Sequence, residues 1–327
     1  MGDRNVNGKS ILACTAVLAI CALSASAGTI QVGPTRTYTT VLAGYNAASP
    51  GDTIEIDSGS YTGIAACGVT IYKNNLTFRG VGPTRPVLDA AGSNIGDKGI
   101  FVVYSGNLTV ENLEFKNTAG PSMNDAGIRY QPQTFPALLT VRNCYFHHNQ
   151  NGILTDGGST TDVFIENTEF YRNGAGDGYS HNMYIGNLRS FTLQHCYVHG
   201  AVVGHEVKTR AITNKILYNL IHSDYTGSRE LQLANGGTAY VIGNVIRQGS
   251  ATGNSQIITY GDEGTNANPY LYIVNNTLIN ERDNGATFLV KSKTTNEAIW
   301  QNNIVQWFGN ETIVGGTYAS QVTQVTN

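Results

Sequence analysis

Residues 139–170 read LTVRNCYFHHNQNGILTDGGSTTDVFIENTEF, and this stretch contains one short phrase twice. The first copy is LTVRN at 139–143 and the second is VFIEN at 163–167. Alternating apolar and polar residues predict strands with one buried face, and a repeat this long without a helical period predicts that each unit is one coil of a solenoid. The phrase returns at intervals of 24–32 residues, at 76–80, 108–112, 191–195, 217–219, 240–244, 271–275 and 298–302.

The repeat predicts an all-β fold, a single-stranded parallel β-helix of about nine coils. The asparagine that ends most copies suits a sharp turn, because Asn tolerates left-handed backbone angles and its amide both donates and accepts hydrogen bonds. Stacked on successive coils, such residues would satisfy the backbone groups of a buried turn. We therefore expect one interior corner to be lined by Asn112, Asn143, Asn167, Asn219, Asn244 and Asn275.

The open end of a solenoid has to be covered. Residues 38–48 place Val41, Leu42 and Tyr45 on one face of a predicted helix. We interpret this segment as the N-terminal cap helix of the β-helix.

The first residues have the pattern of an export signal. Arg4 and Lys9 precede an apolar run over residues 11–23, which ends in Ala-Ser-Ala at 25–27. This predicts a signal peptide over residues 1–27, a β-helix domain over residues 28–327 and a secreted or periplasmic protein. Lipidation at Cys21 is the alternative reading of the same segment. We expect no membrane span, since the run is too short for one.

The composition excludes some partners. Only 13% of the residues are charged and the formal net charge is −3, so we expect no nucleic-acid binding, which needs a basic stripe. Cys67, Cys144 and Cys196 remain after the predicted signal peptide, an odd number without C-x-x-C spacing, so no closed disulfide framework is expected. Cys144 and Cys196 each lie in an apolar strand pattern and are expected to be buried thiols. We expect a monomer.

Each coil should hold a second strand upstream of the repeated phrase. The candidates lie at 127–131, 152–156, 182–186, 206–210, 230–234 and 256–260. Side chains alternate along a strand, so if Val207 and Thr209 point inward, Glu206, Lys208 and Arg210 point outward. Stacking in register then predicts an outward patch with two rows, Asn182–Glu206–Glu230 and Tyr184–Lys208–Gln232.

The patch has the groups that β-elimination from a uronic acid polymer requires. That reaction needs the substrate carboxylate neutralised, a base for the α-proton and an acid for the leaving oxygen. Glu206, Glu230 and Asn182 offer hard oxygen ligands for Ca²⁺. We expect Lys208 to be the base and Arg210 or Tyr184 to steady or protonate the leaving group. The predicted substrate is an acidic polysaccharide.

Further residues around this patch have predicted roles. Gln232, His181 and Tyr260 are expected to bind substrate, and Tyr179 and Tyr184 could stack on sugar rings. His205 is expected to be a hydrogen-bonded core residue, and His195 to occupy a structural corner position. The pair Asp262-Glu263 lies in a Gly-rich stretch and is interpreted as a turn.

The chain resembles the exported right-handed parallel β-helix proteins, a superfamily rich in polysaccharide lyases, over nearly all of residues 28–327. The residues that carry the resemblance are SPGDTIEI at 49–56, GSY at 59–61 and RPVLD at 85–89. The stretch GHEVKTR at 204–210 is similar to the Glu…Lys-Ser strand of the β-helical alginate and chondroitin lyases, in which the lysine is the base and acidic residues bind calcium. That family has an Arg-His pair on the next coil, whereas this chain reads LQLANGG at 231–237.

Three other functions use the same fold. Glu206 and Glu230, as stacked neighbours about 5 Å apart, would suit a retaining glycoside hydrolase. A uronan epimerase would begin with the same proton abstraction as a lyase. A non-enzymatic glycan-binding or surface protein would repeat its polar groups along many coils, whereas here they concentrate within residues 182–234.

Overall fold

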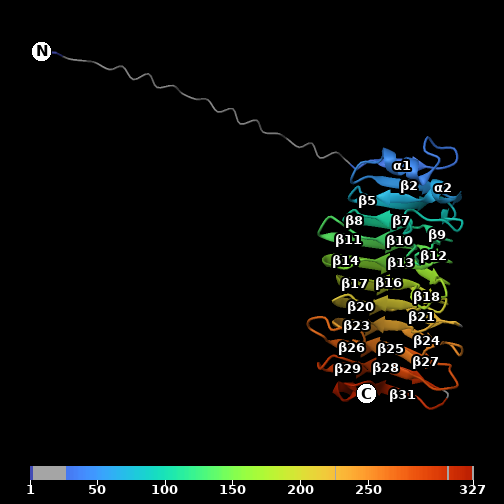
Figure 1. Ribbon diagram of the computed structural model, residues 1–327, viewed down its shortest axis with the longest axis vertical. Helices are drawn as coiled ribbons and strands as arrows, with labels where there is room; N and C mark the ends of the chain where they lie inside the picture. Colours follow the sequence, from blue (N-terminus) through green and yellow to red (C-terminus); the bar gives the residue numbers. More distant parts are fainter. Residues whose placement is uncertain (3–26, 225, 308, 326–327) are drawn as a thin grey trace.

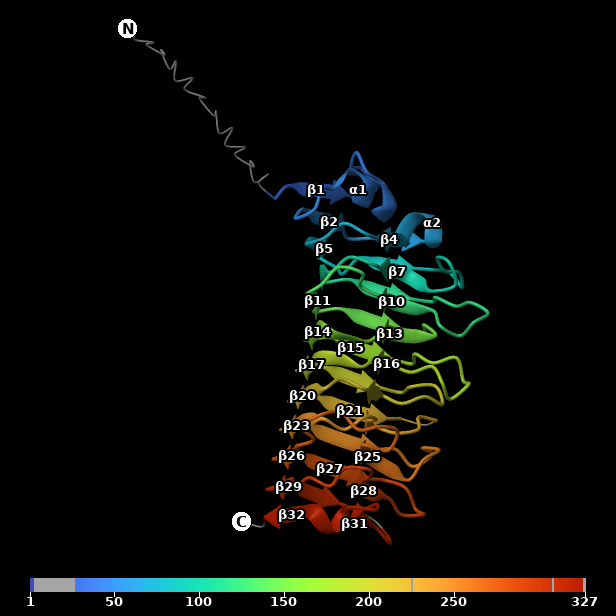
Figure 2. The ribbon, with the colours of Figure 1, turned by 60° about the vertical axis from the view of Figure 1, so that its left-hand side comes forward.

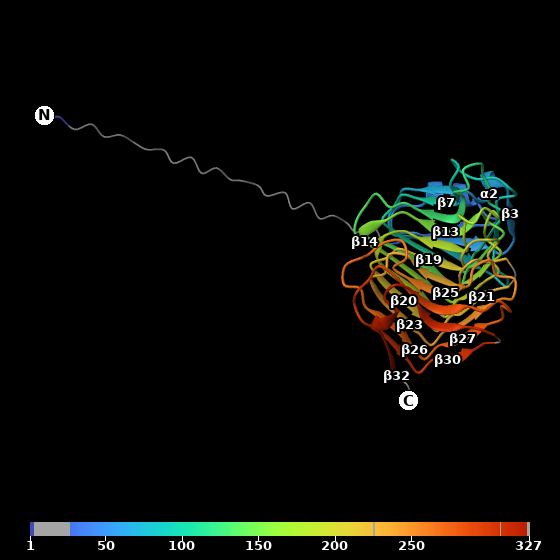
Figure 3. The same ribbon diagram turned by 60° about the horizontal axis from the view of Figure 1, so that its bottom comes forward.

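The computed structural model describes residues 1–2, 27–224, 226–307 and 309–325. From Thr29 onward they form a rod of stacked coils, with the N-terminal end at the top of Figure 1 and the C-terminal end at the bottom. Three parallel sheets run the length of the rod, and each coil contributes about one strand to each sheet. The view toward the end of the rod shows the coils wound around a common interior (Figure 3).

The first sheet, here called sheet A, contains the strands of the repeated phrase, all paired in parallel. Its twelve strands are β1 (Thr29–Val32), β2 (Thr53–Asp57), β5 (Leu76–Val81), β8 (Asn107–Glu111), β11 (Ala137–Arg142), β14 (Gly158–Glu166), β17 (Leu188–Gln194), β20 (Thr213–Leu217), β23 (Thr238–Ile242), β26 (Leu271–Val274), β29 (Ala298–Gln301) and β32 (Val322–Val325).

The second sheet, sheet B, follows the corner at which the repeated phrase ends. Its ten strands are β3 (Ser60–Thr62), β6 (Val87–Asp89), β9 (Glu114–Lys116), β12 (Tyr145–His147), β15 (Glu169–Tyr171), β18 (Tyr197–His199), β21 (Leu220–Ser223), β24 (Val245–Gln248), β27 (Thr277–Asn280) and β30 (Ile304–Gln306).

The third sheet, sheet C, contains the predicted second strand of each coil and runs down the middle of the rod in Figure 1. Its ten strands are β4 (Val69–Ile71), β7 (Gly99–Val103), β10 (Ala126–Tyr130), β13 (Asn151–Thr155), β16 (Met183–Ile185), β19 (Val207–Thr209), β22 (Leu231–Leu233), β25 (Gln256–Tyr260), β28 (Thr287–Lys291) and β31 (Thr312–Gly315).

The predicted fold class, a right-handed parallel β-helix, is confirmed. Its core consists of inward side chains that repeat from coil to coil. Phe115, Phe146 and Phe170 are fully buried and stack with ring centroids 4.8 and 5.0 Å apart. The expected nine coils were too few, because sheet A has twelve strands. The undercount arose at both ends, where β1, β2 and β32 lack the repeated phrase.

The asparagines of the repeated phrase lie at one corner, but they occupy two adjacent positions there rather than a single position. Asn112, Asn143, Asn167 and Asn275 have φ between 48° and 58°, the left-handed region expected of a sharp turn. Their side chains are half-buried or exposed, so the prediction that they line the interior is wrong for these four. His195 shares this position, with φ 52°, and its ring stacks on Tyr218 at 5.6 Å.

The interior ladder uses the next residue of each coil. Asn244 Oδ1 accepts hydrogen bonds from the backbone N–H and the amide of Asn219, at 2.9 and 3.0 Å. Asn276 Oδ1 accepts the same two hydrogen bonds from Asn244, and Asn303 Oδ1 accepts them from Asn276. The prediction of an interior ladder is therefore confirmed for Asn219 and Asn244. On earlier coils the same position carries the buried residues Leu113, Cys144, Thr168 and Cys196.

The N-terminal end is covered by the predicted cap helix, α1 (Val41–Ala47), whose N-cap Thr40 accepts a hydrogen bond from the Ala43 amide. Val41 and Tyr45 are buried as expected, but Leu42 is 38% exposed, because Gly44 takes the third buried place against Val32. A second short helix, α2 (Ile64–Cys67), follows β3 (Figure 2). One 3₁₀ turn, η1 (Ala319–Gln321), precedes the last strand.

The predictions for the cysteines, for a membrane span and for the signal peptide have different outcomes. Among the described residues, Cys67, Cys144 and Cys196 are free, buried thiols, which confirms the prediction for Cys144 and Cys196. Within the described ranges no helix has the length and apolar content needed to cross a bilayer. The predicted signal peptide, residues 1–27, falls almost wholly outside the described residues.

The interior ladder yields a stability prediction. Asn244→Ala removes the partner of two donors on Asn219 and of the Ile216 carbonyl, all of them buried. We expect a loss of about 2–3 kcal/mol in the free energy of unfolding, because buried polar groups left without partners are costly. Asn275→Gly is the matched control one position before the ladder, since glycine keeps the positive φ, and should change stability by less than about 1 kcal/mol. Equal urea midpoints for the two variants would contradict a stabilising ladder.

Candidate active site

The predicted row of outward side chains on sheet C is present. Tyr184 of β16 pairs in register with Lys208 of β19, which pairs with Gln232 of β22. Val207 and Thr209, on either side of Lys208, are fully buried, so alternation directs Lys208 outward. The sequence thus placed Tyr184, Lys208 and Gln232 side by side correctly.

Lys208 is held by an ion pair that links distant parts of the chain. Its Nζ donates a hydrogen bond to Glu263 Oε1 at 2.7 Å and lies 5.6 Å from the centre of the Tyr184 ring. Only 12% of the Lys208 side chain is exposed. The ammonium is therefore fixed between an aromatic face and a carboxylate at the protein surface.

Arg210 joins the same cluster through three different nitrogens. Nε donates to the Tyr184 hydroxyl at 2.7 Å, Nη1 to Asn235 Oδ1 at 3.1 Å, and Nη2 to Glu263 Oε2. Each oxygen of Glu263 thus faces a different cation, one on Lys208 and one on Arg210. Burial acts to raise the pKa of Glu263, but the hydrogen bond from Lys208 and the charges of Lys208 and Arg210 outweigh it, so that the pKa is lowered.

The loop after β25 brings Glu263 and Asp262 over the patch. The backbone N–H groups of Glu263 and Gly264 donate to the Ala234 carbonyl at 2.9 and 3.1 Å, which folds the loop back toward the previous coil. Asp262 Oδ2 accepts from Arg229 Nη1 at 3.1 Å. The sequence-based interpretation of Asp262-Glu263 as an ordinary turn missed this role, since strand alternation says nothing about where a loop folds.

Gln232 lies beneath that loop. Its Nε2 donates to Asp262 Oδ2 at 2.8 Å and to Glu263 Oε1 at 2.9 Å, and the residue is only 1% exposed. The predicted substrate contact by Gln232 therefore requires the loop to be displaced. In the described structure Gln232 positions the two carboxylates.

Two stacked histidines lie next to the patch. The rings of His181 and His205 are 4.8 Å apart and nearly parallel, and His181 also stacks on Tyr184 at 5.8 Å. His181 Nδ1 accepts the His205 amide, and His205 Nδ1 accepts the Arg229 amide. Burial and the positive charge of Lys208 lower the pKa of His181 to about 3, so both rings are neutral supports.

His205 is thus the hydrogen-bonded core residue that was expected. His181 is 2% exposed and contacts Tyr184, so it adjoins the patch without presenting a surface to substrate. The Tyr260 prediction is wrong. Tyr260 is fully buried on the inward face of β25, and its hydroxyl donates to the Gly237 carbonyl at 2.5 Å. Tyr260 pairs in register with the inward residue Leu233, whereas its neighbour Thr259 pairs with the outward residue Gln232.

The predicted calcium ligands also face the interior. Asn182, Glu206 and Glu230 are fully buried, although strand alternation had directed them outward. They come just before β16, β19 and β22, where the chain turns the corner into sheet C. Alternation does not hold through a corner, which is the physical reason for the error.

Asn182 and Glu206 complete an interior ladder at that corner. Asn149 Oδ1 accepts the backbone N–H of Thr118, and Asn173 Oδ1 accepts that of Asn149. Asn182 Oδ1 then accepts the backbone N–H of Asn173 at 3.1 Å. Glu206 Oε1 accepts the Ala201 N–H at 2.9 Å and Oε2 accepts from Asn182 Nδ2. Both side chains are therefore structural, because Ala201 stands where the two preceding coils have Asn149 and Asn173 and cannot itself accept a hydrogen bond through its side chain.

The donor set does not fit a Ca²⁺ ion. Burial raises the pKa of Glu230 to about 8 and that of Glu206 well above its usual range, so both carboxyls favour the protonated form. Glu230 already accepts from Ser223 at 2.5 Å and from Gln248 at 3.3 Å. Within the ranges the structure describes, no group of three or more His, Cys, Asp or Glu residues is arranged to hold a metal.

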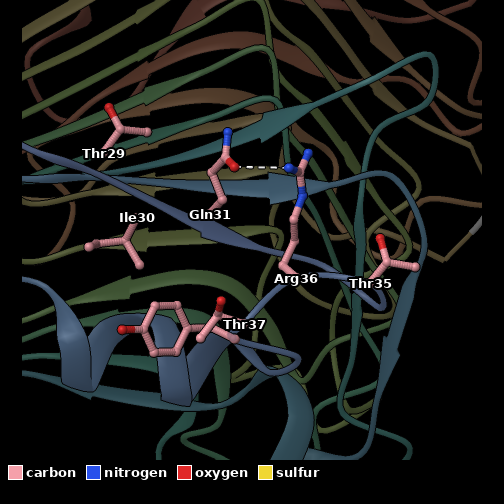
Figure 4. Close-up of a pocket in the computed structure, with 7 residues that line it drawn as sticks. Thr29, Ile30, Gln31, Thr35, Arg36 and Thr37 are labelled. Atoms are coloured by element: carbon pink, nitrogen blue, oxygen red, sulfur yellow. Dashed lines mark hydrogen bonds between the residues drawn. The ribbon is translucent and has the colours of Figure 1, made fainter.

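A shallow hollow adjoins the Tyr184 side of the patch. It has a volume of about 330 Å³, and its walls include Arg129, Leu154, Asp156, Tyr179 and Tyr184. A different hollow of about 440 Å³ lies at the N-terminal end of the rod (Figure 4). There Arg36 donates to Gln31 at 2.9 Å and pairs with Asp57 at 2.7 Å, so its charge is neutralised. Of these two hollows, the one beside Tyr184 adjoins the cluster of Lys208, Arg210 and Glu263.

The buried Glu230 makes stability depend on pH. Below about pH 4.5 this carboxyl is protonated in both the folded and the unfolded chain. Between 4.5 and 8 the unfolded chain ionises while the folded one keeps its proton, so the free energy of unfolding falls as pH rises, by up to about 1.4 kcal/mol per unit.

Glu230→Gln should remove that part of the slope and make the protein more stable than the wild type at pH 8. Glu297→Gln, at an exposed position, is the control and should keep the wild-type slope. Melting temperatures between pH 5 and 9 test this. Parallel curves for the wild type and Glu230→Gln would show that Glu230 is ionised in the fold.

Comparison with known proteins agrees with the fold. The family described as "Right handed beta helix region" matches residues 35–183 and 67–246. No curated protein matches the sequence. Among solved structures, the pectin methylesterase from Aspergillus niger is similar with 13% identity and a TM-score of 0.37, over 92% of this chain and 91% of that one. Pectin methylesterase PemA from Erwinia chrysanthemi is similar with 12% identity and a TM-score of 0.34, over 91% and 92%.

Likeness to solved structures at this level carries no information about chemistry. The family match, in contrast, covers more than half of the chain and agrees with the stacked parallel sheets described above. The chain belongs to the right-handed β-helix family.

Proposed function

We propose that this protein is an exported polysaccharide lyase that cleaves a uronic-acid-containing polysaccharide by β-elimination at Tyr184, Lys208 and Arg210. The observation that supports this most is the position of the Glu263 carboxylate, which lies between Lys208 Nζ and Arg210 Nη2. A uronate presents the same chemical group. A uronate that displaces Glu263 would pair its carboxylate with Arg210 and bring its C5 proton to Lys208 Nζ.

Neutralising that carboxylate is the first requirement of the reaction, since it makes the adjacent C5 proton more acidic. Arg210 suits this role because its planar fork is fixed by Tyr184 and Asn235. Arg210 cannot give up a proton and so cannot be the base. Its part is to bind and orient the uronate.

Lys208 is the proposed base. Its Nζ would take the C5 proton, the electron pair would form the C4–C5 double bond, and the C4–oxygen bond would break. In the described structure the Glu263 carboxylate, at 2.7 Å, occupies the Lys208 Nζ that would have to take this proton. Displacement of Glu263 by substrate is therefore part of the proposal.

Tyr184 is the proposed acid for the leaving oxygen. Its hydroxyl oxygen accepts a hydrogen bond from Arg210 Nε, so its own proton points elsewhere and is available for donation. The ring also forms one wall of the adjacent hollow, where the neighbouring sugar would lie. Arg210 would stabilise the phenolate that remains.

We derive no step through calcium, because Asn182, Glu206 and Glu230 do not fit the ion. The same burial removes the basis for a glycoside hydrolase, since Glu206 and Glu230 have no surface from which to reach a glycosidic bond. An epimerase would share the proton abstraction at Lys208, and a binding protein would share the uronate contacts. Both are outcomes of the experiment.

The deciding experiment incubates the full chain with alginate, polygalacturonate, hyaluronan and chondroitin, with and without chelator. A lyase produces unsaturated ends that absorb in the ultraviolet, and the signal should survive chelation. Inverted uronates without chain cleavage would indicate an epimerase. Binding without chemical change would indicate a glycan-binding protein and contradict the lyase proposal.

Substitutions at Lys208 test the base. Lys208→Ala should lower kcat 10²-fold or more, the usual contribution of a general base, while the melting temperature changes little. Lys208→Arg keeps the charge but cannot release a proton, so it should be equally inactive. Lys215→Ala, an exposed lysine on sheet A, is the control and should keep full activity. Substantial turnover by Lys208→Arg would exclude the lysine as base.

Substitution of Glu263 tests whether it competes with substrate. Glu263→Gln removes the charge that occupies Lys208 and Arg210 but keeps the shape of the side chain. We expect a lower KM for the acidic polysaccharide, by several-fold, measured in initial rates at low ionic strength, where charge effects are largest. A raised KM would mean that Glu263 supports the substrate site rather than competing for it.

A further inference from the structure

We propose that Arg129, in the hollow beside Tyr184, binds a second carboxylate of the same polysaccharide chain. This inference rests on the proposed function, because it assumes that an acidic glycan lies across sheet C. It adds a requirement on the substrate. The polymer should carry an acidic group a few sugar units away from the bond that is cut, as a run of consecutive uronates does.

The register of sheet C places Arg129 in line with the patch. Arg129 of β10 pairs with Leu154, Leu154 with Tyr184, and Tyr184 with Lys208. Neighbouring strands are about 4.8 Å apart, so three steps separate Arg129 from Lys208 by roughly 14 Å along the rod. A glycan lying along the rod at Lys208 would therefore reach Arg129 within a few sugar units.

The guanidinium of Arg129 has unused donors. It carries five N–H groups, and among the described residues its one hydrogen bond goes from Nη2 to Asp156 Oδ1, at 3.0 Å. Its Nε is buried and has no partner within the part of the chain that the structure describes, and only 13% of the side chain is exposed. Burial lowers the pKa of Arg129. A carboxylate in the hollow would supply the missing acceptor.

Asp156 does not satisfy Arg129 fully. One of its oxygens accepts from Arg129 and the other from Gln131 Nε2 at 2.9 Å. Its side chain is 49% exposed, so water screens its charge. Arg142 on sheet A is the contrast, because it pairs with both Glu111 and Glu166.

The remaining walls of the hollow suit a sugar ring. Tyr179 is 87% exposed, an unusual amount for a large apolar side chain, and it lines the hollow with Tyr184, Leu154 and Met123. Aromatic faces with a few placed polar groups are the usual composition of small-ligand sites. The hollow thus combines a cation for the carboxylate with apolar walls for the ring.

The test measures binding of oligogalacturonates and oligomannuronates of two to eight units by calorimetry. All variants are made in the Lys208→Ala background, so that the oligosaccharides are not consumed. Arg129→Leu should weaken binding of the longest oligomers by about tenfold or more, because a charge-assisted contact is lost. Arg129→Lys, which keeps the charge but not the fork, should lose less. Disaccharides, too short to reach both sites, should bind equally to all variants.

Arg142→Leu is the control for a lost surface arginine and should bind every length as the parent does. Equal affinity of Arg129→Leu and the parent for long oligomers would overturn the inference, even if the protein proves to be a lyase. A length-dependent loss in Arg129→Leu, in a protein that cleaves nothing, would support the inference and reject the lyase. Absence of any binding by both the wild type and the Lys208→Ala parent would reject both proposals.

Discussion

The structure depends on one constraint, which is that every coil must hydrogen-bond to the next in parallel register. Inward positions then stack on inward positions, as with Phe115, Phe146 and Phe170, and outward positions on outward ones. A cluster of functional groups can therefore be assembled from residues about one repeat apart. Tyr184, Lys208 and Gln232 are such a set, brought together by three short strands.

The same constraint explains the polar residues in the interior. Each coil turns three times, and the backbone N–H groups at the corners need acceptors because water cannot reach them. Asn219, Asn244 and Asn276 supply them at one corner, where they accept the backbone N–H groups of Cys196, Asn219 and Asn244. At another, Asn182 and Glu206 complete the series. A buried acid in this fold is thus first a substitute for a ladder asparagine, and only second a candidate for chemistry.

The sequence predicted what strand alternation controls and failed where it does not. The fold class, the sheet C strands and the Tyr184–Lys208–Gln232 row followed from periodicity. Asn182, Glu206 and Glu230 were misplaced because they lie one residue before their strands, at a corner. Asp262 and Glu263 were missed because a loop can fold back in many ways. Arg129 was not predicted as a binding residue, because the sequence of a single strand does not show whether a guanidinium lacks hydrogen-bond partners.

The reach of the loop after β25 has a consequence for motion. In a solenoid each coil contacts only its neighbours, so the terminal coils open most easily. Glu263 is tied to Lys293, whose Nζ donates to its carbonyl at 3.0 Å and which follows β28, next to the last strand of sheet C. Fraying from the C-terminal end would loosen this tether before it disturbs β19. The ion pair between Lys208 and Glu263 therefore depends in part on a contact made near the C-terminal end of the rod.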